Sequence, residues 1–242
     1  MCGIVGYVGR RSAAAVLMDG LDKLSYRGYD SAGIAVIDPQ QRIKVRKAKG
    51  RLDNLAHLLE NTPADGCVGI GHTRWATHGE PSDVNSHPHN GGNVTIVHNG
   101  IIENYRELKE KLEAQGREFY SETDTEVVAK LLDINYEGDP IKAIEKTLAE
   151  VTGSFALGIL FKDIPNVIYA VRRGSPLIVG VKDEEGFIAS DVPAIIKYTK
   201  DYYLLEHDEI AKIAEGSITF TDLKGNPIEK ELKTADWDMD AA

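Results

Sequence analysis

The sequence predicts an α+β fold in which two antiparallel or mixed sheets are covered by helices. Short runs rich in Val and Ile, bounded by Gly, Asp or Asn, occur near both ends of the chain and are typical of strands. Helical patterns lie between them in pairs, whereas a doubly wound parallel sheet would require strands and helices to alternate. The strands are predicted at residues 3–9, 32–38, 67–73, 94–100, 154–161, 166–174, 176–181, 186–190 and 217–222.

Helices are predicted from apolar residues at helical spacing. They cover residues 12–28, 103–116, 123–134 and 139–153. Gly28 and Gly116 are candidate stops for the first two helices, because glycine is frequent just after a helix C-terminus. Thr123 and Glu126 form the pattern of a capping box at the start of the third helix. Pro140 falls in the first turn of the fourth helix, where its missing N–H is not needed.

Composition and charge argue against nucleic-acid and membrane partners. The net charge of −10 is unfavourable for binding a phosphate backbone. The basic stretch at residues 42–51 alternates apolar and cationic side chains, which predicts a strand with a solvated cationic face. No apolar run approaches the roughly 20 residues that span a bilayer, and the N-terminus does not resemble a secretory signal. The sequence therefore predicts a cytoplasmic protein, in which Cys2 and Cys67 stay reduced.

Cys2 is the first candidate for chemistry. A cysteine at a strand start is most often a small buried hydrophobic residue. Its position behind Met1 changes this interpretation, because a small second residue commonly permits removal of the methionine. Cys2 would then carry a free α-amine with a pKa of about 7.7–8.0, which can act as a base near neutral pH. One residue would supply both a thiol nucleophile and its proton acceptor.

The dipeptide Asn99–Gly100 follows a predicted strand and has two interpretations. On local sequence alone a hairpin turn is favoured. Alternatively, the side-chain N–H of Asn99 and the backbone N–H of Gly100 could form an oxyanion hole.

Further candidates lie in residues 71–82 and at the start of the third helix. Arg74 could pair with a carboxylate, although an exposed arginine in a loop is usually only solvated. Trp75 could belong to the core or cover a site, and Thr77 and His78 could order on a ligand. Asp124 could stabilise the helix dipole or receive a substrate ammonium.

A cluster of histidines offers a rival interpretation as a metal site. Five of the seven histidines fall between positions 72 and 98: His72, His78, His87, His89 and His98. The sequence contains no HExxH or CxxC pattern that would support metal binding. A non-catalytic metal- or ligand-binding module therefore stays an alternative with weak support.

Several long motifs, taken together, closely resemble one family of enzymes. These motifs are CGIVGY, YRGYDSAG, HTRWATHGEPS, HPH, HNGIIENY and SETDTEVV, in this order. They resemble the N-terminal glutaminase domain of the glucosamine-6-phosphate synthase family, which is also called glutamine–fructose-6-phosphate aminotransferase (isomerizing). Other class II amidotransferases share the N-terminal cysteine and the Asn-Gly pair, so a module with another ammonia acceptor stays open.

The resemblance implies the N-terminal-nucleophile fold, a four-layer sandwich of two stacked antiparallel sheets flanked by helices. It implies that residues 1–232 form the class II glutaminase domain and that residues 233–242 begin a linker. The implied partner is a sugar-phosphate isomerase portion that aminates fructose 6-phosphate, in a full-length enzyme that is a homodimer. No cofactor and no metal are implied.

The resemblance also implies roles for the central residues. Cys2, exposed by loss of Met1, resembles the nucleophile, with its α-amine as the base. Asn99 and Gly100 resemble the oxyanion hole. Arg74 resembles the residue that binds the α-carboxylate of L-glutamine, and Asp124 the one that accepts its α-ammonium.

Five more residues are implied in lesser roles. Thr77 and His78 resemble additional contacts to glutamine. Trp75 resembles the side chain that gates the passage of ammonia. Arg27 and Gly28 match a pair beside the nucleophile that has a supporting role.

Overall fold

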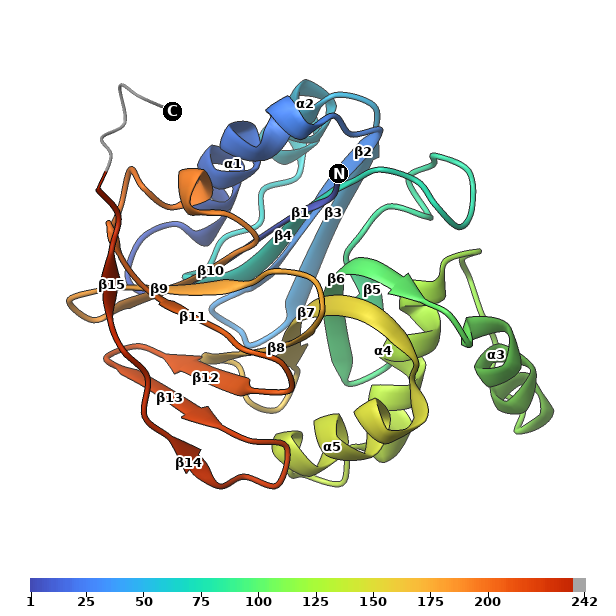
Figure 1. Cartoon of the computed structure of the whole chain (residues 1–242). Coiled ribbons are helices and arrows are strands. Elements are labelled where there is room, and N and C mark those ends of the chain that lie inside the picture. Colours follow the sequence, from blue (N-terminus) through green and yellow to red (C-terminus); the bar gives the residue numbers. More distant parts are fainter. Residues whose placement is uncertain (237–242) are drawn as a thin grey trace.

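The computed structural model describes residues 1–236 and consists of four layers, with two sheets packed face to face between two layers of helices (Figure 1). Every strand pair among the described residues is antiparallel. The predicted fold class, a four-layer sandwich of two stacked antiparallel sheets flanked by helices, is confirmed by this arrangement.

The first sheet contains β1 close to its centre. Its order is β15 (Lys233–Thr234), β11 (Asp201–Leu204), β9 (Ile178–Lys182), β10 (Glu185–Ala189), β1 (Gly3–Val8), β4 (Val68–Arg74), β2 (Ser31–Ile37) and β3 (Ile43–Lys49). The second sheet runs β14 (Pro227–Ile228), β13 (Ser217–Thr221), β12 (Ile210–Ala214), β8 (Val167–Arg173), β7 (Gly153–Phe161), β6 (Val94–Ile102) and β5 (His89–Asn90).

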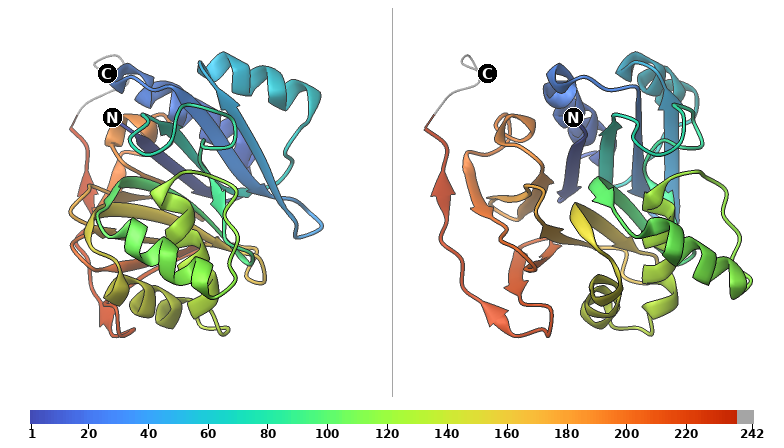
Figure 2. Two further views of the ribbon diagram at one scale, coloured as in Figure 1. Left: turned by 90° about the vertical axis from the view of Figure 1, so that its right-hand side faces the viewer. Right: turned by 45° about the vertical axis from the view of Figure 1, so that its right-hand side comes forward.

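The helices cover the outer faces of the sheets. Helices α1 (Ala13–Leu24) and α2 (Leu52–Asn61) pack on the first sheet, and α3 (Tyr105–Ala114), α4 (Asp124–Asn135) and α5 (Pro140–Glu150) lie on the side of the second. Figure 2 shows the blue and cyan helices of the first group on the opposite side of the sandwich from the green and yellow-green helices of the second. Two short 3₁₀ helices, Ser25–Arg27 and Val192–Ala194, complete the regular structure of residues 1–236. None of the helices in this range is long and apolar enough to cross a bilayer.

Three apolar layers hold the sandwich together, because alternate side chains of a strand face opposite ways. On β1, Ile4 points between the sheets and Val5 points toward α1. On β6, Val97 points between the sheets and Ile96 points toward the helices of the second sheet. All four side chains are fully buried. The middle layer therefore consists of residues from both sheets, and its end defines where a site can open between them.

The predicted strands all exist, within two residues at each end, and the basic stretch is β3 as expected. The structure also contains elements that were not predicted. These are strands β5, β11, β12, β14 and β15 and helix α2. Strand β15 falls in the segment predicted as linker, and residues 237–242 of that segment lie outside the described residues. The division into domain and linker therefore stays a prediction.

Two local predictions need correction. Asn99 and Gly100 do not form a hairpin turn, because they lie within β6 and face Ala156 and Phe155 of β7. Only half of the expected capping box is present. The Thr123 hydroxyl accepts the N–H of Glu126 at 3.2 Å, but the Glu126 carboxylate accepts the backbone N–H groups of residues 120 and 121 instead.

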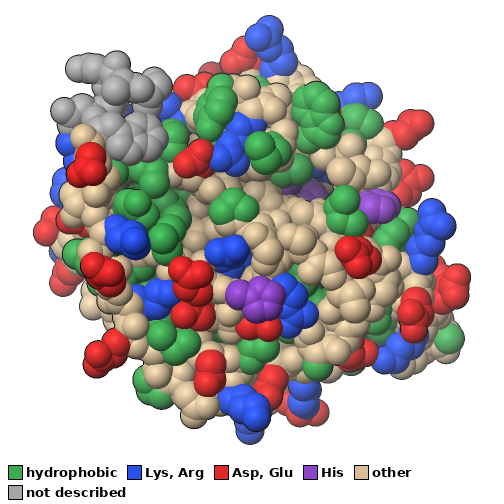
Figure 3. Space-filling model, in the orientation of Figure 1, with side chains coloured by type: hydrophobic (Ala, Val, Ile, Leu, Met, Phe, Trp, Pro, Cys, Tyr) green, Lys and Arg blue, Asp and Glu red, His purple; other side chains and the backbone are tan. Residues whose placement is uncertain are grey.

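Despite the net negative charge, the surface carries both acidic and basic side chains. Figure 3 shows the face of the molecule seen in Figure 1, on which acidic and basic side chains are interspersed. On this face the cationic side chains are mixed with carboxylates, as is typical of a solvated protein surface.

Candidate active site

The candidate residues meet where the apolar layer between the sheets ends. Cys2 precedes Ile4 by two positions and Asn99 follows Val97 by two, so both share the inward face of their sheets. Arg74 ends β4, the neighbour of β1, on the same face. The nucleophile candidate from one sheet and an amide from the other are thereby brought together from positions almost 100 residues apart, since the Asn99 Nδ2 donates to the Cys2 carbonyl.

Cys2 is half-buried and held by three hydrogen bonds. The backbone N–H of Trp75 donates to the Cys2 Sγ at 3.2 Å, the thiol donates to the Trp75 carbonyl at 3.6 Å, and the Asn99 Nδ2 donates to the Cys2 carbonyl at 3.2 Å. Burial raises the pKa of the Cys2 thiol, while the Trp75 N–H, the chain N-terminus and Arg74 act in the opposite direction. Since burial dominates, the thiol is protonated near neutral pH and needs a base before it can attack.

Asn99 and Gly100 lie beside this thiol on β6. Asn99 is buried, and Gly100 has a positive φ of 112°, which departs from regular strand geometry. Both residues line the same cavity as Cys2. An oxyanion hole can be built from one side-chain and one backbone N–H donor, and these two residues carry one group of each kind.

Arg74 is a buried cation, with only 3% of its surface exposed. Its Nη2 donates to the carbonyl of Gly79 at 2.9 Å and to that of His78 at 2.5 Å, and its Nη1 donates to the carbonyl of Glu80 at 3.4 Å. Burial lowers the pKa of the guanidinium, and Asp30 is the carboxylate that opposes this most strongly. Arg74 is therefore not a solvated loop residue, because it holds the segment that follows it.

Asp124 lies at the start of α4 and is also buried. Its Oδ2 accepts the backbone N–H of Ile102 at 2.9 Å, and its Oδ1 lies 4.0 Å from Nδ1 of His78. The His78 ring in turn packs edge-on against Tyr105. Asp124 thus presents one free carboxylate oxygen toward His78 at the wall of the site.

The remaining candidates surround the nucleophile. Trp75 is 55% exposed, and its ring lies so close to Gly28 that a Cβ there would come within 2.7 Å of it. Thr77 is exposed on the cavity wall. Arg27 forms an ion pair with Asp191 at 2.6 Å. The backbone carbonyl of Arg27 accepts a hydrogen bond from the N-terminal amino group of Met1 at 3.0 Å.

Cys2 stands between two cavities of very different size. The outer cavity measures about 480 Å³ and opens beside Met1 and Trp75. The inner cavity measures only about 10 Å³, and Arg74 and Asp124 line it together with Cys2. In this conformation the inner cavity has room for a single water molecule at most.

Sequence reasoning did not identify several residues of the site. Ser175, Pro176 and Ser190 line the outer cavity from loops distant in sequence, and no local pattern distinguishes them. Asp30 accepts the backbone N–H of Ala76 at 2.5 Å and so fixes the segment after Arg74. Its place in the motif YRGYDSAG was a signal that could have identified it.

The histidine cluster is not a metal site within residues 1–236. No group of three or more His, Cys, Asp or Glu side chains in this range is arranged to hold a metal ion. Four of the five histidines are instead buried side by side, and His78 is half-buried next to Asp124.

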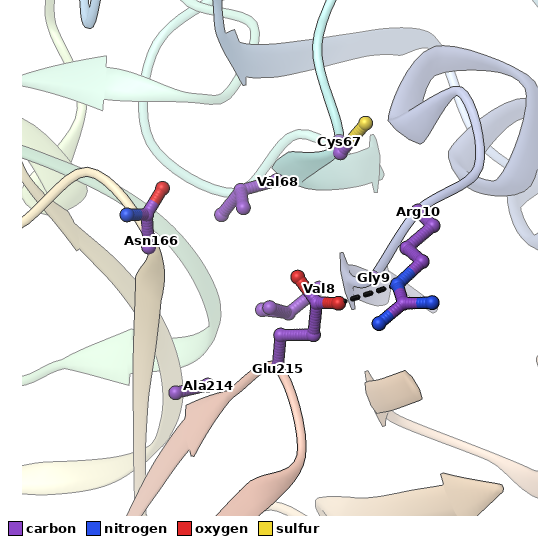
Figure 4. A pocket seen from close by; sticks show the side chains of 8 residues that line it. All are labelled: Val8, Gly9, Arg10, Cys67, Val68, Asn166, Ala214 and Glu215. Carbon is purple, nitrogen blue, oxygen red and sulfur yellow. Dashed lines mark hydrogen bonds and ion pairs between the residues drawn. The ribbon is translucent and has the colours of Figure 1, made fainter. Parts of the chain in front are cut away.

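A separate cavity of about 550 Å³ lies beyond the other end of β1, away from the two cavities at Cys2. It is lined by the second cysteine, Cys67 (Figure 4). Its cation, Arg10, is already paired with the carboxylates of Glu184 and Glu215. Cys67 is exposed, and the arginine that lines this cavity, Arg10, is exposed as well, whereas Cys2 lies beside the buried Arg74. We therefore place the candidate chemistry at Cys2.

The chain is similar to known glutamine amidotransferases and aminotransferases. A family model described as "Glutamine amidotransferase domain" matches residues 72–197, which is just over half of the chain. Two similar curated proteins are named "Glutamine--fructose-6-phosphate aminotransferase [isomerizing]". The protein from Caldanaerobacter subterraneus subsp. tengcongensis is 54% identical over 244 residues, and that from Clostridium perfringens is 52% identical. Each match covers the whole of this chain but only 40% of the relative's length.

Solved structures show the same fold. The structure titled "Structure of the allosteric regulatory enzyme of purine biosynthesis" superposes with a TM-score of 0.82 at 26% identity. The glutamine phosphoribosylpyrophosphate amidotransferase of B. subtilis, complexed with ADP and GMP, gives a TM-score of 0.79 at 26% identity. Both matches cover 93% of this chain and 50% of the other. Together with the family match and the geometry around Cys2, they show that the chain belongs to the family of glutamine amidotransferase domains.

Proposed function

We propose that this chain hydrolyses L-glutamine to glutamate and ammonia through a thioester on Cys2, after Met1 is removed. The observation that carries the proposal is that the Asn99 amide is hydrogen-bonded to the backbone of Cys2 and lines the same cavity, while Cys2 also lies next to a buried cation and a buried carboxylate. With Met1 attached the nitrogen of Cys2 is an amide and cannot act as a base. Removal of Met1 is therefore part of the proposal.

The reaction balances with glutamine and water alone. The α-amine of Cys2 accepts the thiol proton, and the thiolate attacks the side-chain amide carbon of glutamine. Asn99 Nδ2 and the Gly100 N–H stabilise the resulting oxyanion, and one such donor contributes about 3–4 kcal/mol to lowering the barrier. The C–N bond breaks as the α-ammonium returns its proton to the leaving nitrogen. Water then attacks the thioester, with the amine again as base, and releases glutamate.

Recognition of glutamine is assigned to two charges. Arg74 would bind the α-carboxylate and Asp124 the α-ammonium, which orients the amide toward the thiol. Because the inner cavity is too small for an amino acid, binding would displace carbonyl groups of residues 78–80 from Arg74. Thr77 and His78 would contact the substrate from this displaced segment.

The other candidates are assigned to the outer cavity. Trp75, more than half exposed at its mouth, would control the passage of ammonia. Arg27 would fix the chain end through its carbonyl and its ion pair with Asp191. Gly28 would leave room for the Trp75 ring.

We infer a wider role from the relatives, of which this chain spans 40%. Residues 1–232 would be the glutaminase domain and 233–242 the start of a linker to an isomerase portion. That portion would use the ammonia to convert fructose 6-phosphate to glucosamine 6-phosphate, in a cytoplasmic homodimer. An amidotransferase with a different acceptor is the second candidate, since the structural relatives named above include one that acts on phosphoribosylpyrophosphate.

A glutaminase assay on two matched cysteine variants tests the proposal. Protein shown by intact mass to lack Met1 is expected to release glutamate and ammonia in equal amounts. Cys2→Ala should abolish this release, because no thioester can form, whereas Cys67→Ala at the distant cavity should leave it unchanged. Full activity of Cys2→Ala, or no activity of the processed parent chain, would contradict the proposal.

A further inference from the structure

Four of the clustered histidines form a buried group behind the proposed oxyanion hole. The rings of His72 and His87 stack with centroids 4.0 Å apart and planes 10° from parallel. The rings of His89 and His98 also lie next to that of His87, with centroids 5.0 and 6.2 Å away. At most 5% of any of these residues is exposed. None of them has a part in the reaction as described above.

One member of the group touches the oxyanion donor directly. The Nε2 of His72 lies 3.0 Å from the Oδ1 of Asn99, in a fully buried contact. The other end of the same amide, Nδ2, donates to the carbonyl of Cys2 at 3.2 Å. A side-chain amide can be turned by 180°, so these two contacts decide which end faces the nucleophile.

Only one arrangement of protons satisfies both contacts. The Cys2 carbonyl is an acceptor, so it requires the NH₂ end of Asn99. The Oδ1 end then requires a donor, which must be the Nε2–H of His72. The other ring nitrogen, Nδ1, is buried and has no hydrogen-bond partner. A proton on Nδ1 would be a buried N–H without an acceptor, so Nδ1 carries the lone pair and Nε2 carries the proton. Burial also lowers the pKa of His72 to about 3, so the ring is neutral and carries one proton.

The surrounding structure fixes the His72 ring. His72 lies on β4, opposite Ile4 of β1 and Gly33 of β2. His87 covers one face of the ring, and its Nδ1 accepts the backbone N–H of His98 at 3.4 Å. The His72 ring is therefore held through the backbone of a central strand and by the stacked ring of His87, which lies in the segment just before β5.

We propose that His72 is a positioning residue, whose Nε2–H fixes the Asn99 amide with its NH₂ group toward the nucleophile and so preforms the oxyanion hole. The inference rests on the proposed glutaminase function. It assigns His72 no contact with the substrate. Removing one oxyanion donor typically lowers kcat by roughly 100- to 1000-fold. Losing only the orientation of such a donor is expected to lower kcat by a smaller factor.

Three variants of position 72 separate orientation from packing. His72→Gln places an amide N–H at about the position of Nε2, whereas His72→Asn is one methylene shorter and does not reach it. His72→Phe keeps a ring against His87 but has no donor. We expect His72→Gln to retain kcat within about 5-fold, and the other two to lose about 10- to 100-fold in kcat with little change in KM.

Two further measurements distinguish positioning from general damage. Alkylation of Cys2 by iodoacetamide, followed on the N-terminal peptide, forms no oxyanion and should proceed at the parent rate in all three variants. In an Asn99→Ala background, His72→Phe should cost no additional activity, because a residue that acts through Asn99 has nothing left to orient.

The outcomes are decisive in either direction. The inference is overturned by an unchanged kcat in His72→Phe, or by an equal loss with and without Asn99. If the variants do not fold, ¹⁵N spectra of the unaltered chain decide, since a proton on Nδ1 of His72 would also overturn it. An inactive parent chain would instead refute the proposed function, so the two failures are distinguishable.

Discussion

At the scale of single residues, Arg74 is the side chain whose environment most clearly indicates a ligand. It is buried, yet within the described residues its hydrogen-bond partners are carbonyl groups and no carboxylate lies within ion-pairing distance. Burying a charge is costly unless it is compensated by hydrogen bonds or by an opposite charge. An anionic ligand such as an α-carboxylate would supply the missing charge.

We predict that Arg74→Lys raises the KM for glutamine by about 10- to 100-fold and changes kcat less. A lysine keeps the charge but loses the planar fork, and a hydrogen bond to a charged group contributes about 1.5–3 kcal/mol. Initial rates over a range of glutamine concentrations measure the effect, with the exposed Arg117→Lys as the matched control. An unchanged KM would remove Arg74 from the substrate site.

At the scale of elements, β6 carries the part of the site that differs most from regular structure. Gly100 has a φ of 112°, and an added Cβ would lie 2.0 Å from the backbone oxygen of Ser154 on β7. A side chain there would force the two strands apart next to Asn99. The glycine is thus required by close approach as well as by its backbone angle.

Gly116 provides a matched control for the substitution of Gly100. It also has a positive φ, of 82°, but an added Cβ meets nothing within 4 Å. We predict that Gly116→Ala costs about 1–2 kcal/mol of unfolding free energy, from the backbone angle alone. Gly100→Ala should cost at least about 2 kcal/mol more than this and should reduce glutaminase activity. Urea denaturation of both variants tests the prediction, which equal costs would refute.

At the scale of the whole molecule, folding buries a set of histidines and thereby disfavours their protonated forms. Burial lowers the pKa of His72 to about 3 and also lowers those of His87, His89 and His98. In the unfolded chain a histidine has a pKa of about 6.5. Between these values the unfolded state binds more protons, so stability decreases as the pH falls from about 6.5 toward 3.

We predict that His72 alone lowers the free energy of unfolding by about 2 kcal/mol between pH 7 and pH 5. Urea denaturation at the two pH values measures the total decrease, to which the other buried histidines add. The variant His72→Gln cannot be protonated, so its decrease should be smaller by about that amount. Identical pH dependence in both proteins would show that His72 is not a neutral buried group.

The sequence by itself determined the elements with strong local patterns and the identity of the family. The runs of β1 and β6 that are rich in Val and Ile, the apolar stripes of α1 and α5, and the position of Pro140 are local properties of the chain. They follow from local composition and from the period of the helix, so they can be predicted without contacts. Short strands such as β5 and β14 were not predicted, because two residues carry no period.

Only the tertiary structure decided what the polar residues do. The sequence of Asn99 and Gly100 favours a turn, but pairing with β7 places them in a strand beside Cys2. The pattern at Glu126 suggests a complete cap, but a stronger set of partners at residues 120–121 takes its carboxylate. The histidines suggest metal ligands, but the sheets bury them as neutral rings, one of which faces Asn99. For Asn99, Gly100 and the histidines the deciding partners are distant in sequence, and for Glu126 they lie five and six residues away. In each case packing outcompetes the simplest local pattern, because burial makes every polar group depend on the groups packed against it.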